Sequence, residues 1–220
     1  MFNRVHNIEF SNKPTTWRSS FFWLLDQFKG SKIRKHYDAI KRINKNHECD
    51  YAKQQRTTYL NQILLHAVKT VPYYKFLGIT ATSLQHFPVV NKNLIKKNSK
   101  SFLSKSYVNK KTFNASTSGS TGTPFTVVHD ENKKRRHKAD VHFFWETVGH
   151  TWGQGFYYFR IWNKQNRKSK FIQKIQNISP IEVFKLNDSK IKEFLNRIIF
   201  GNAPKSILSY ASALDGIVKY

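Results

Sequence analysis

The chain has 220 residues, and 38 lysines and arginines against 13 aspartates and glutamates give it a formal net charge of +25. Its single cysteine, Cys49, excludes an internal disulfide and a cysteine-based zinc site. Hydrophobic residues make up 39% and aromatic residues 15% of the chain, which predicts a globular fold and excludes a disordered one.

The charge indicates anionic partners such as nucleic acid, an acidic membrane face or a phosphorylated substrate. The lysines are, however, spread along the chain among many asparagines and isoleucines, so compositional drift explains much of the excess. The N-terminus lacks a continuous apolar signal segment, and no run approaches the ~20 apolar residues that cross a bilayer. We therefore expect a cytoplasmic protein.

The first fifty residues form a basic and aromatic segment. Apolar residues at positions 17, 21, 24, 25 and 28 follow the spacing of one helix face, and lysines and arginines follow between residues 29 and 35. Two interpretations remain open. The helix packs against the rest of the protein, or segment 17–35 is an amphipathic anchor on an anionic membrane surface.

A second helix is predicted over residues 54–69, with a broad apolar face formed by Tyr59, Leu60, Ile63, Leu64, Ala67 and Val68. It should end before Pro72, because the residue that precedes a proline avoids the α region. His66 on this helix is interpreted as a packed or surface histidine. Residues 73–110 are expected to be rich in loops, with short helices near 73–77 and 92–98.

The most informative segment reads Thr-Ser-Gly-Ser-Thr-Gly-Thr-Pro over residues 117–124. Glycine permits close approach of the backbone to a ligand, and successive N–H groups in such a turn form a concavity that suits anionic oxygens. Strands predicted near 112–116 and 125–129 flank the segment, which argues against a flexible linker. The phosphate-binding residues predicted here are Thr117, Ser118, Gly119, Ser120, Thr121, Gly122 and Thr123.

Two common nucleotide-binding motifs are absent from the sequence. Thr123 and Pro124 stand where a P-loop would have its lysine and hydroxyl residue. The one Gly-x-Gly, at residues 153–155, has no third glycine at the distance that a dinucleotide-binding fold requires. The sequence therefore predicts neither a P-loop ATPase nor a Rossmann dehydrogenase.

Downstream of the loop, helices and strands alternate. Asp130 is expected to cap a helix over 131–149 whose stripe of Val141, Phe144, Trp145 and Val148 is core. The basic residues of its first turns, at 133–136 and 138, are interpreted as a solvent-facing cluster, with a bound anion as the alternative. Strands at 156–162, 181–184 and 206–209 alternate with helices at 189–200 and from 211, and Asn187 or Asp188 should cap the first of these helices.

These patterns predict an α/β protein in two parts. Residues 1–110 form a mainly helical region, and residues 111–220 form a partial α/β subdomain that carries the phosphate-binding loop. Its sheet is expected to be mixed or parallel and covered by helices.

The loop resembles the phosphate-binding signature of the adenylate-forming enzymes, most closely the phenylacetate–CoA ligase family with its CapK-like branch linked to capsular polysaccharide biosynthesis. Three weaker motifs follow the same order in this chain. They are Leu64–Ala67 with Val71–Tyr74, then Phe87–Lys92 with Asn91 in place of threonine, and Ser209–Leu214 with Ala211 in place of proline. The resemblance therefore extends from about residue 60 to residue 214.

The resemblance implies an ATP- and Mg-dependent ligase that activates a carboxylic acid as an acyl-adenylate, with coenzyme A as a possible acceptor. Nucleotide and carboxylic acid are thus the implied partners, and no specific nucleic acid is expected. No catalytic or metal-binding residue is assigned, because enzymes of the family are roughly twice as long and carry those residues downstream. The chain is expected to correspond to a truncated N-terminal half that shows no ATP–pyrophosphate exchange alone.

The alternative function is a non-enzymatic basic module that binds anionic membrane or nucleic acid. An attachment through segment 17–35 would place the protein peripherally at the inner membrane face.

Overall fold

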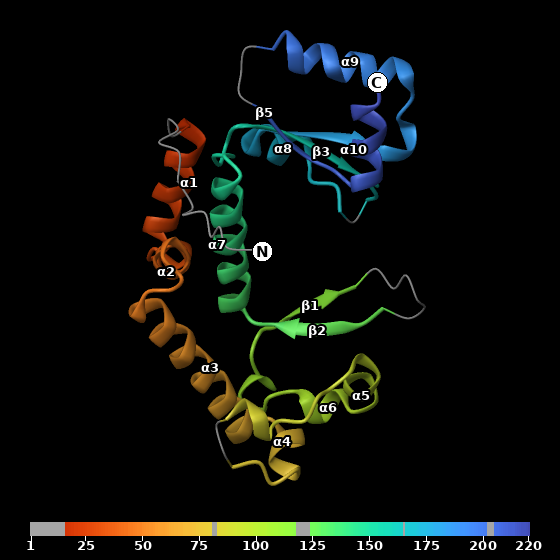
Figure 1. The fold of residues 1–220 in the computed structure, drawn as a ribbon. Helices are drawn as coiled ribbons and strands as arrows, with labels where there is room; N and C mark the ends of the chain where they lie inside the picture. The colour runs from red at the N-terminus through yellow and green to blue at the C-terminus, as the bar shows by residue number, and fades with distance from the viewer. Residues whose placement is uncertain (1–15, 81–82, 118–123, 165, 202–204) are drawn as a thin grey trace, which may run out of the picture. The chain divides into compact units, whose positions relative to one another are not determined.

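The computed structural model describes residues 16–80, 83–117, 124–164, 166–201 and 205–220 (Figure 1). The chain divides into two compact units, with divisions after Arg34 and after Asp140. The first unit contains residues 35–140, and the second contains residues 16–34 and 141–220. The boundary predicted between residues 110 and 111 coincides with neither division.

The first unit is mainly helical. Its elements are α2 (Lys32–Lys45), α3 (Asp50–Thr70), α4 (Pro72–Phe76), α5 (Lys92–Lys97), α6 (Ser99–Phe102), the start of α7 (Glu131–Thr147), and 3₁₀ turns at Leu84–His86 and Lys105–Tyr107. The short helices predicted near 73–77 and 92–98 are confirmed. Helix α3 ends as predicted, because Val71 takes an extended conformation (φ −96°, ψ 114°) before Pro72.

The apolar face predicted on α3 and the core stripe predicted on α7 are only partly buried. On α3, Leu64 is 6% exposed whereas Ile63 is 59% exposed. On α7, Phe144 and Val148 are 57% and 79% exposed, and the buried neighbour is Phe143 at 0%. The prediction for α7 was therefore wrong by a rotation of about one residue on the helix, or ~100°.

Strands β1 (Phe113–Ser116) and β2 (Thr126–His129) form an antiparallel pair of their own. Phe113 lies opposite His129, and Ser116 lies opposite Thr126. Both predicted strands are confirmed. They form a sheet separate from the three-stranded sheet of the second unit, whereas the sequence predicts one sheet for residues 111–220. The short connection between them suits an antiparallel hairpin and is too short for a parallel crossover.

The second unit contains a three-stranded parallel sheet in the order β4-β3-β5. The strands are β3 (Gly155–Arg160), β4 (Ile178–Glu182) and β5 (Lys205–Leu208), and the helices are α1 (Trp17–Phe28), α8 (Lys170–Gln176), α9 (Asp188–Ile199) and α10 (Ala211–Val218). Helix α8 connects β3 to β4, and α9 connects β4 to β5, as parallel strands require. The predicted α/β class with a parallel sheet is confirmed.

The core of the second unit lies on one face of β3. Tyr157 and Phe159 of this strand pack with Phe194 of α9 and Ile217 of α10, and all four side chains are less than 9% exposed. Asn187 is the N-cap of α9, one of the two caps predicted, and its side chain accepts a hydrogen bond from the N–H of Lys190 (3.0 Å). Because strand side chains alternate, Phe156 and Tyr158 point to the opposite face of the sheet.

The strand predicted at 181–184 begins three residues earlier, at Ile178. Pro180 lies within this strand because β4 is an edge strand, where a proline costs no ladder hydrogen bond on its open side. Residues Val183–Lys185 leave the sheet as a 3₁₀ turn.

Over the ranges given above, none of the helices combines the length and apolar character that a bilayer-crossing helix needs. Helix α3 has 21 residues but includes Asp50, Lys53, Arg56 and Lys69.

Candidate functional site

The β1–β2 hairpin holds the ends of the predicted phosphate loop together. The N–H of Thr117 donates to the carbonyl of Phe125 (2.9 Å), and the N–H of Phe125 donates to the Thr117 hydroxyl (3.1 Å). One step further into the ladder, the hydroxyls of Ser116 and Thr126 share a hydrogen bond of 2.7 Å. The segment is thus the loop of a closed hairpin, which argues against an interdomain linker.

Of the predicted loop residues, the structure describes only Thr117. Its hydroxyl is engaged in closing the hairpin. The other six predicted residues lie outside the described part of the chain: Ser118, Gly119, Ser120, Thr121, Gly122 and Thr123.

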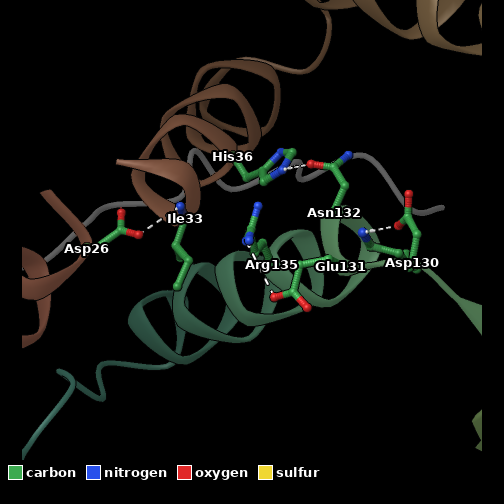
Figure 2. Close-up of polar contacts among 8 residues, drawn as sticks. Asp26, Ile33, His36, Asp130, Glu131, Asn132 and Arg135 are labelled. Atoms are coloured by element: carbon green, nitrogen blue, oxygen red, sulfur yellow. Dashed lines mark hydrogen bonds and ion pairs between the residues drawn. The ribbon is translucent and has the colours of Figure 1, made fainter. Parts of the chain in front are cut away.

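Asp130 fixes the base of the hairpin, directly after β2. One carboxylate oxygen accepts a hydrogen bond from the N–H of Lys133 (2.6 Å) and so caps α7, as predicted (Figure 2). The other accepts from the hydroxyl of Tyr107 (3.1 Å). A two-stranded hairpin is marginal alone, so these bonds to a helix and to a preceding 3₁₀ turn stabilise it.

The basic residues at the start of α7 mostly have partners. Lys134 lies over the ring of Phe113, with its Nζ 3.4 Å from the ring centroid. Arg135 pairs with Glu131 (3.5 Å), and Arg136 pairs with Asp140 (3.4 Å). The contact with Phe113 lies at the base of the hairpin, about 10 Å from Ser116 by strand rise. This cluster therefore lies at the opposite end of the strands from the predicted loop.

Removing the Asp130 carboxylate should destabilise the first unit. We expect Asp130→Ala to lower the free energy of unfolding by about 1–2 kcal/mol, because α7 loses its cap and the Tyr107 hydroxyl loses its acceptor. Asp130→Asn keeps an acceptor for the cap and should lose less. Urea unfolding measures both, and equal stability of Asp130→Ala and wild type would contradict this role.

The pKa of Tyr107 is raised from its ordinary value, mainly by its hydrogen bond to Asp130 and further by burial and the Asp130 charge. The folded state therefore favours the protonated phenol. The contribution of the Tyr107 hydroxyl to the free energy of unfolding should be complete below about pH 10. It should be lost as the pH rises through the higher folded-state pKa. We expect the stability advantage of wild type over Tyr107→Phe to be flat from neutral pH and to fall in alkali. An advantage that grows in alkali would contradict the assignment.

A cavity of about 300 Å³ lies in the second unit on the face of β3 away from its core. Aromatic walls come from Trp145, Phe156, Tyr158 and Trp162, and polar groups come from Arg160, Asn166, Lys168 and Gln173. The guanidinium carbon of Arg160 lies 5.8 Å from the ring centroid of Tyr158 and 6.0 Å from that of Trp162. Tyr158 and Arg160 line this cavity, whereas Tyr157 belongs to the core on the opposite face of β3.

A larger and more open cavity of about 590 Å³ lies between β4 and α9. Its charged lining residues are Arg167, Lys170, Glu182, Lys185, Lys190, Glu193 and Arg197. Two of them, Glu193 and Arg197, form an ion pair with each other. Lysines and arginines exceed the acids, so the cavity favours anions, but its cations come from exposed surface positions.

Two histidines, His66 and His150, have structural contacts. The Nε2 atom of His66 lies within hydrogen-bond distance of the Thr70 hydroxyl (3.2 Å), and its ring packs edge-on against Tyr107. Both contacts agree with the packed or surface role predicted for His66. His150, 5% exposed, bonds through Nδ1 to the Ser206 hydroxyl (2.7 Å). This pair has the residue types of a base and a nucleophile, but it does not line either cavity described above. We therefore interpret the pair as a structural hydrogen bond that joins the segment after α7 to β5.

Among the residues that the structure describes, no three histidine, cysteine, aspartate or glutamate side chains gather as a metal site would require. Comparisons of the chain with protein-family models, curated proteins and solved structures found no match.

Proposed function

We propose that the loop Thr117–Thr123 binds the phosphates of ATP, as part of a carboxylate-activating ligase of the phenylacetate–CoA ligase type. The observation that carries the proposal is the pairing of β1 with β2 up to Thr117 and Phe125. A loop tied at both ends presents its N–H groups from a preorganised frame, and preorganised donors are what a charged phosphate requires.

The loop residues take different roles in this proposal. The backbone from Gly119 to Gly122 supplies N–H donors to phosphate oxygens, and the hydroxyls of Ser118, Ser120, Thr121 and Thr123 add further donors. The Thr117 hydroxyl accepts from Phe125, so its role is to close the hairpin. Holding the leaving phosphates in line is the contribution to the reaction that we assign to these residues.

The donor set fits phosphate better than it fits the metal. Residues 117–123 include no carboxylate, and both oxygens of the nearby Asp130 are bonded to Tyr107 and Lys133. We therefore assign no residue of this hairpin to Mg²⁺, which binds chiefly to phosphate oxygens and water in such sites and neutralises phosphate charge there. No residue is assigned to coenzyme A.

We further propose that the aromatic cavity of the second unit holds the carboxylic acid. Its aromatic walls suit an apolar body, and Arg160 supplies a cation beside them for the carboxylate. The carboxylic acid is already ionised near neutral pH, so the proposal needs no general base. We also propose that both units, the helical one and the one with the parallel sheet, belong to the large domain of an adenylate-forming enzyme. They correspond to the half of that domain that carries the phosphate loop.

Calorimetric titration with Mg-ATP tests the proposal. We expect wild type to bind ATP, and Gly119→Val/Gly122→Val to bind at least about ten-fold more weakly, since added side chains block the approach of phosphate to the backbone. Gly216→Val is the matched control, because a Cβ at Gly216 meets nothing within 4 Å. The proposal would be contradicted if the double variant bound Mg-ATP as tightly as wild type does, or if wild type bound no ATP.

A further inference from the structure

Helix α1 carries an exposed apolar face. Trp17, Phe21, Leu24, Leu25 and Phe28 are 65%, 49%, 48%, 41% and 81% exposed. Their spacing places them along one side of the helix, over its full 12 residues or about 18 Å. Helix α1 does pack against the protein, as one of the two interpretations expected, but this stripe is not its packed side.

The opposite side of α1 is packed on the second unit. The ring of Phe22 stacks on His142 at 4.7 Å and lies 5.4 Å from Trp152. The Thr16 hydroxyl, which caps α1, donates to the carbonyl of Trp152 (2.7 Å). The helix thus has its own core-facing side, and the exposed stripe is additional apolar surface.

The charges around the exposed stripe are almost all positive. Arg18 lies over the ring of Trp17, 4.5 Å from its centroid, and Lys29, Lys32, Arg34 and Lys35 follow the helix with exposed side chains. Asp26 is the one acidic residue between positions 16 and 35. It is 5% exposed, and one of its oxygens accepts from the N–H of Ile33 (Figure 2). Its other oxygen accepts from the N–H of Arg34 (2.8 Å).

We propose that α1 lies flat on an anionic lipid bilayer, with its aromatic residues at the boundary between headgroups and acyl chains. Aromatic side chains favour that depth, and exposed lysines and arginines favour anionic headgroups. Charge decides between a lipid surface and a protein partner here, because an exposed apolar stripe flanked by cations and without an exposed acid is complementary to anionic lipid. Lipid binding by α1 is independent of ATP binding, since the residues proposed to contact lipid differ from those proposed to contact ATP.

Co-sedimentation with vesicles of phosphatidylcholine and phosphatidylglycerol in equal parts tests the proposal, with pure phosphatidylcholine vesicles as the reference. We expect wild type to bind the mixed vesicles, to bind the neutral ones weakly, and to lose affinity as salt is raised. Phe21→Ser/Phe28→Ser should reduce the partition coefficient by more than about ten-fold, because each lost ring removes buried apolar area.

The matched control is Phe171→Ser/Phe200→Ser, which removes two phenylalanines of the same unit that are 74% and 78% exposed, one on α8 and one directly after α9. This variant should bind like wild type. Circular dichroism checks that each variant folds. Absence of binding by wild type, or equal loss in both double variants, would overturn the proposal. Self-association that Phe21→Ser/Phe28→Ser abolishes, without vesicle binding by wild type, would show an interface between copies and would also overturn it.

Discussion

Replacing Phe159 by alanine is expected to lower the free energy of unfolding of the second unit by about 3–5 kcal/mol. Phe159 is 1% exposed on the central strand β3, between β4 and β5. Its ring meets that of Phe194 edge-on, with the centroids 4.8 Å apart. Since β3 is paired on both sides, the backbone cannot move inward to fill the space that the ring leaves.

Urea unfolding followed by tryptophan fluorescence measures this loss. Phe171→Ala is the control, because Phe171 is 74% exposed and its truncation should change stability by less than about 0.5 kcal/mol. A loss of under about 1 kcal/mol for Phe159→Ala would show that this residue does not belong to a packed core.

Gly153→Ala should be the second most damaging change, with an expected loss of about 2–4 kcal/mol. Gly153 has a φ of +85°, a backbone conformation that residues with a side chain rarely adopt. A Cβ there would lie 2.6 Å from the Cβ of Arg18 and closer still to the Thr16 hydroxyl oxygen. The start of α1 would have to move, and the bond from Thr16 to the carbonyl of Trp152 would be lost.

Gly78→Ala separates the two causes of this loss. Gly78 also has a positive φ, +66°, but a Cβ there meets nothing within 4 Å. Thermal unfolding should therefore show a smaller loss, from backbone strain alone, and hydrogen exchange should show faster exchange in α1 only for Gly153→Ala. Equal losses in the two variants would mean that α1 does not pack closely on Gly153.

Local patterns in the sequence were sufficient for the helices with clear caps and for the hairpin strands. The Asp130 cap and the end of α3 before Pro72 depend on chemistry within a few residues, so they were predictable. The uninterrupted aromatic run from Phe156 to Phe159 likewise identified β3.

Features that depend on tertiary packing were not predictable from these patterns. Apolar spacing identified the face of α1 but could not tell which side would meet the protein, because Phe22 and Trp23 offer a second aromatic side. Pro180 was compatible with a strand only because β4 lies at the edge of its sheet. The role of Asp26 depends on a turn that brings Ile33 and Arg34 back to its carboxylate.

The ligase proposal and the membrane proposal can fail separately. The first proposal assigns ATP binding to the loop between β1 and β2, the second assigns lipid binding to α1, and these elements belong to different units. The basic composition supports both, since phosphate oxygens and anionic headgroups attract the same charges. A nucleic-acid-binding module remains the alternative, and binding to nucleic acid that falls steeply with salt would favour it.

The most direct test of the central claim is the response of the loop amides to Mg-ATP in ¹H–¹⁵N NMR spectra. If the loop binds phosphate, the resonances of Gly119 and Gly122 should shift saturably with nucleotide, and tripolyphosphate should shift the same resonances. If both resonances stay in place while ATP binds elsewhere, or if ATP does not bind, the loop is not a phosphate site and the ligase assignment fails.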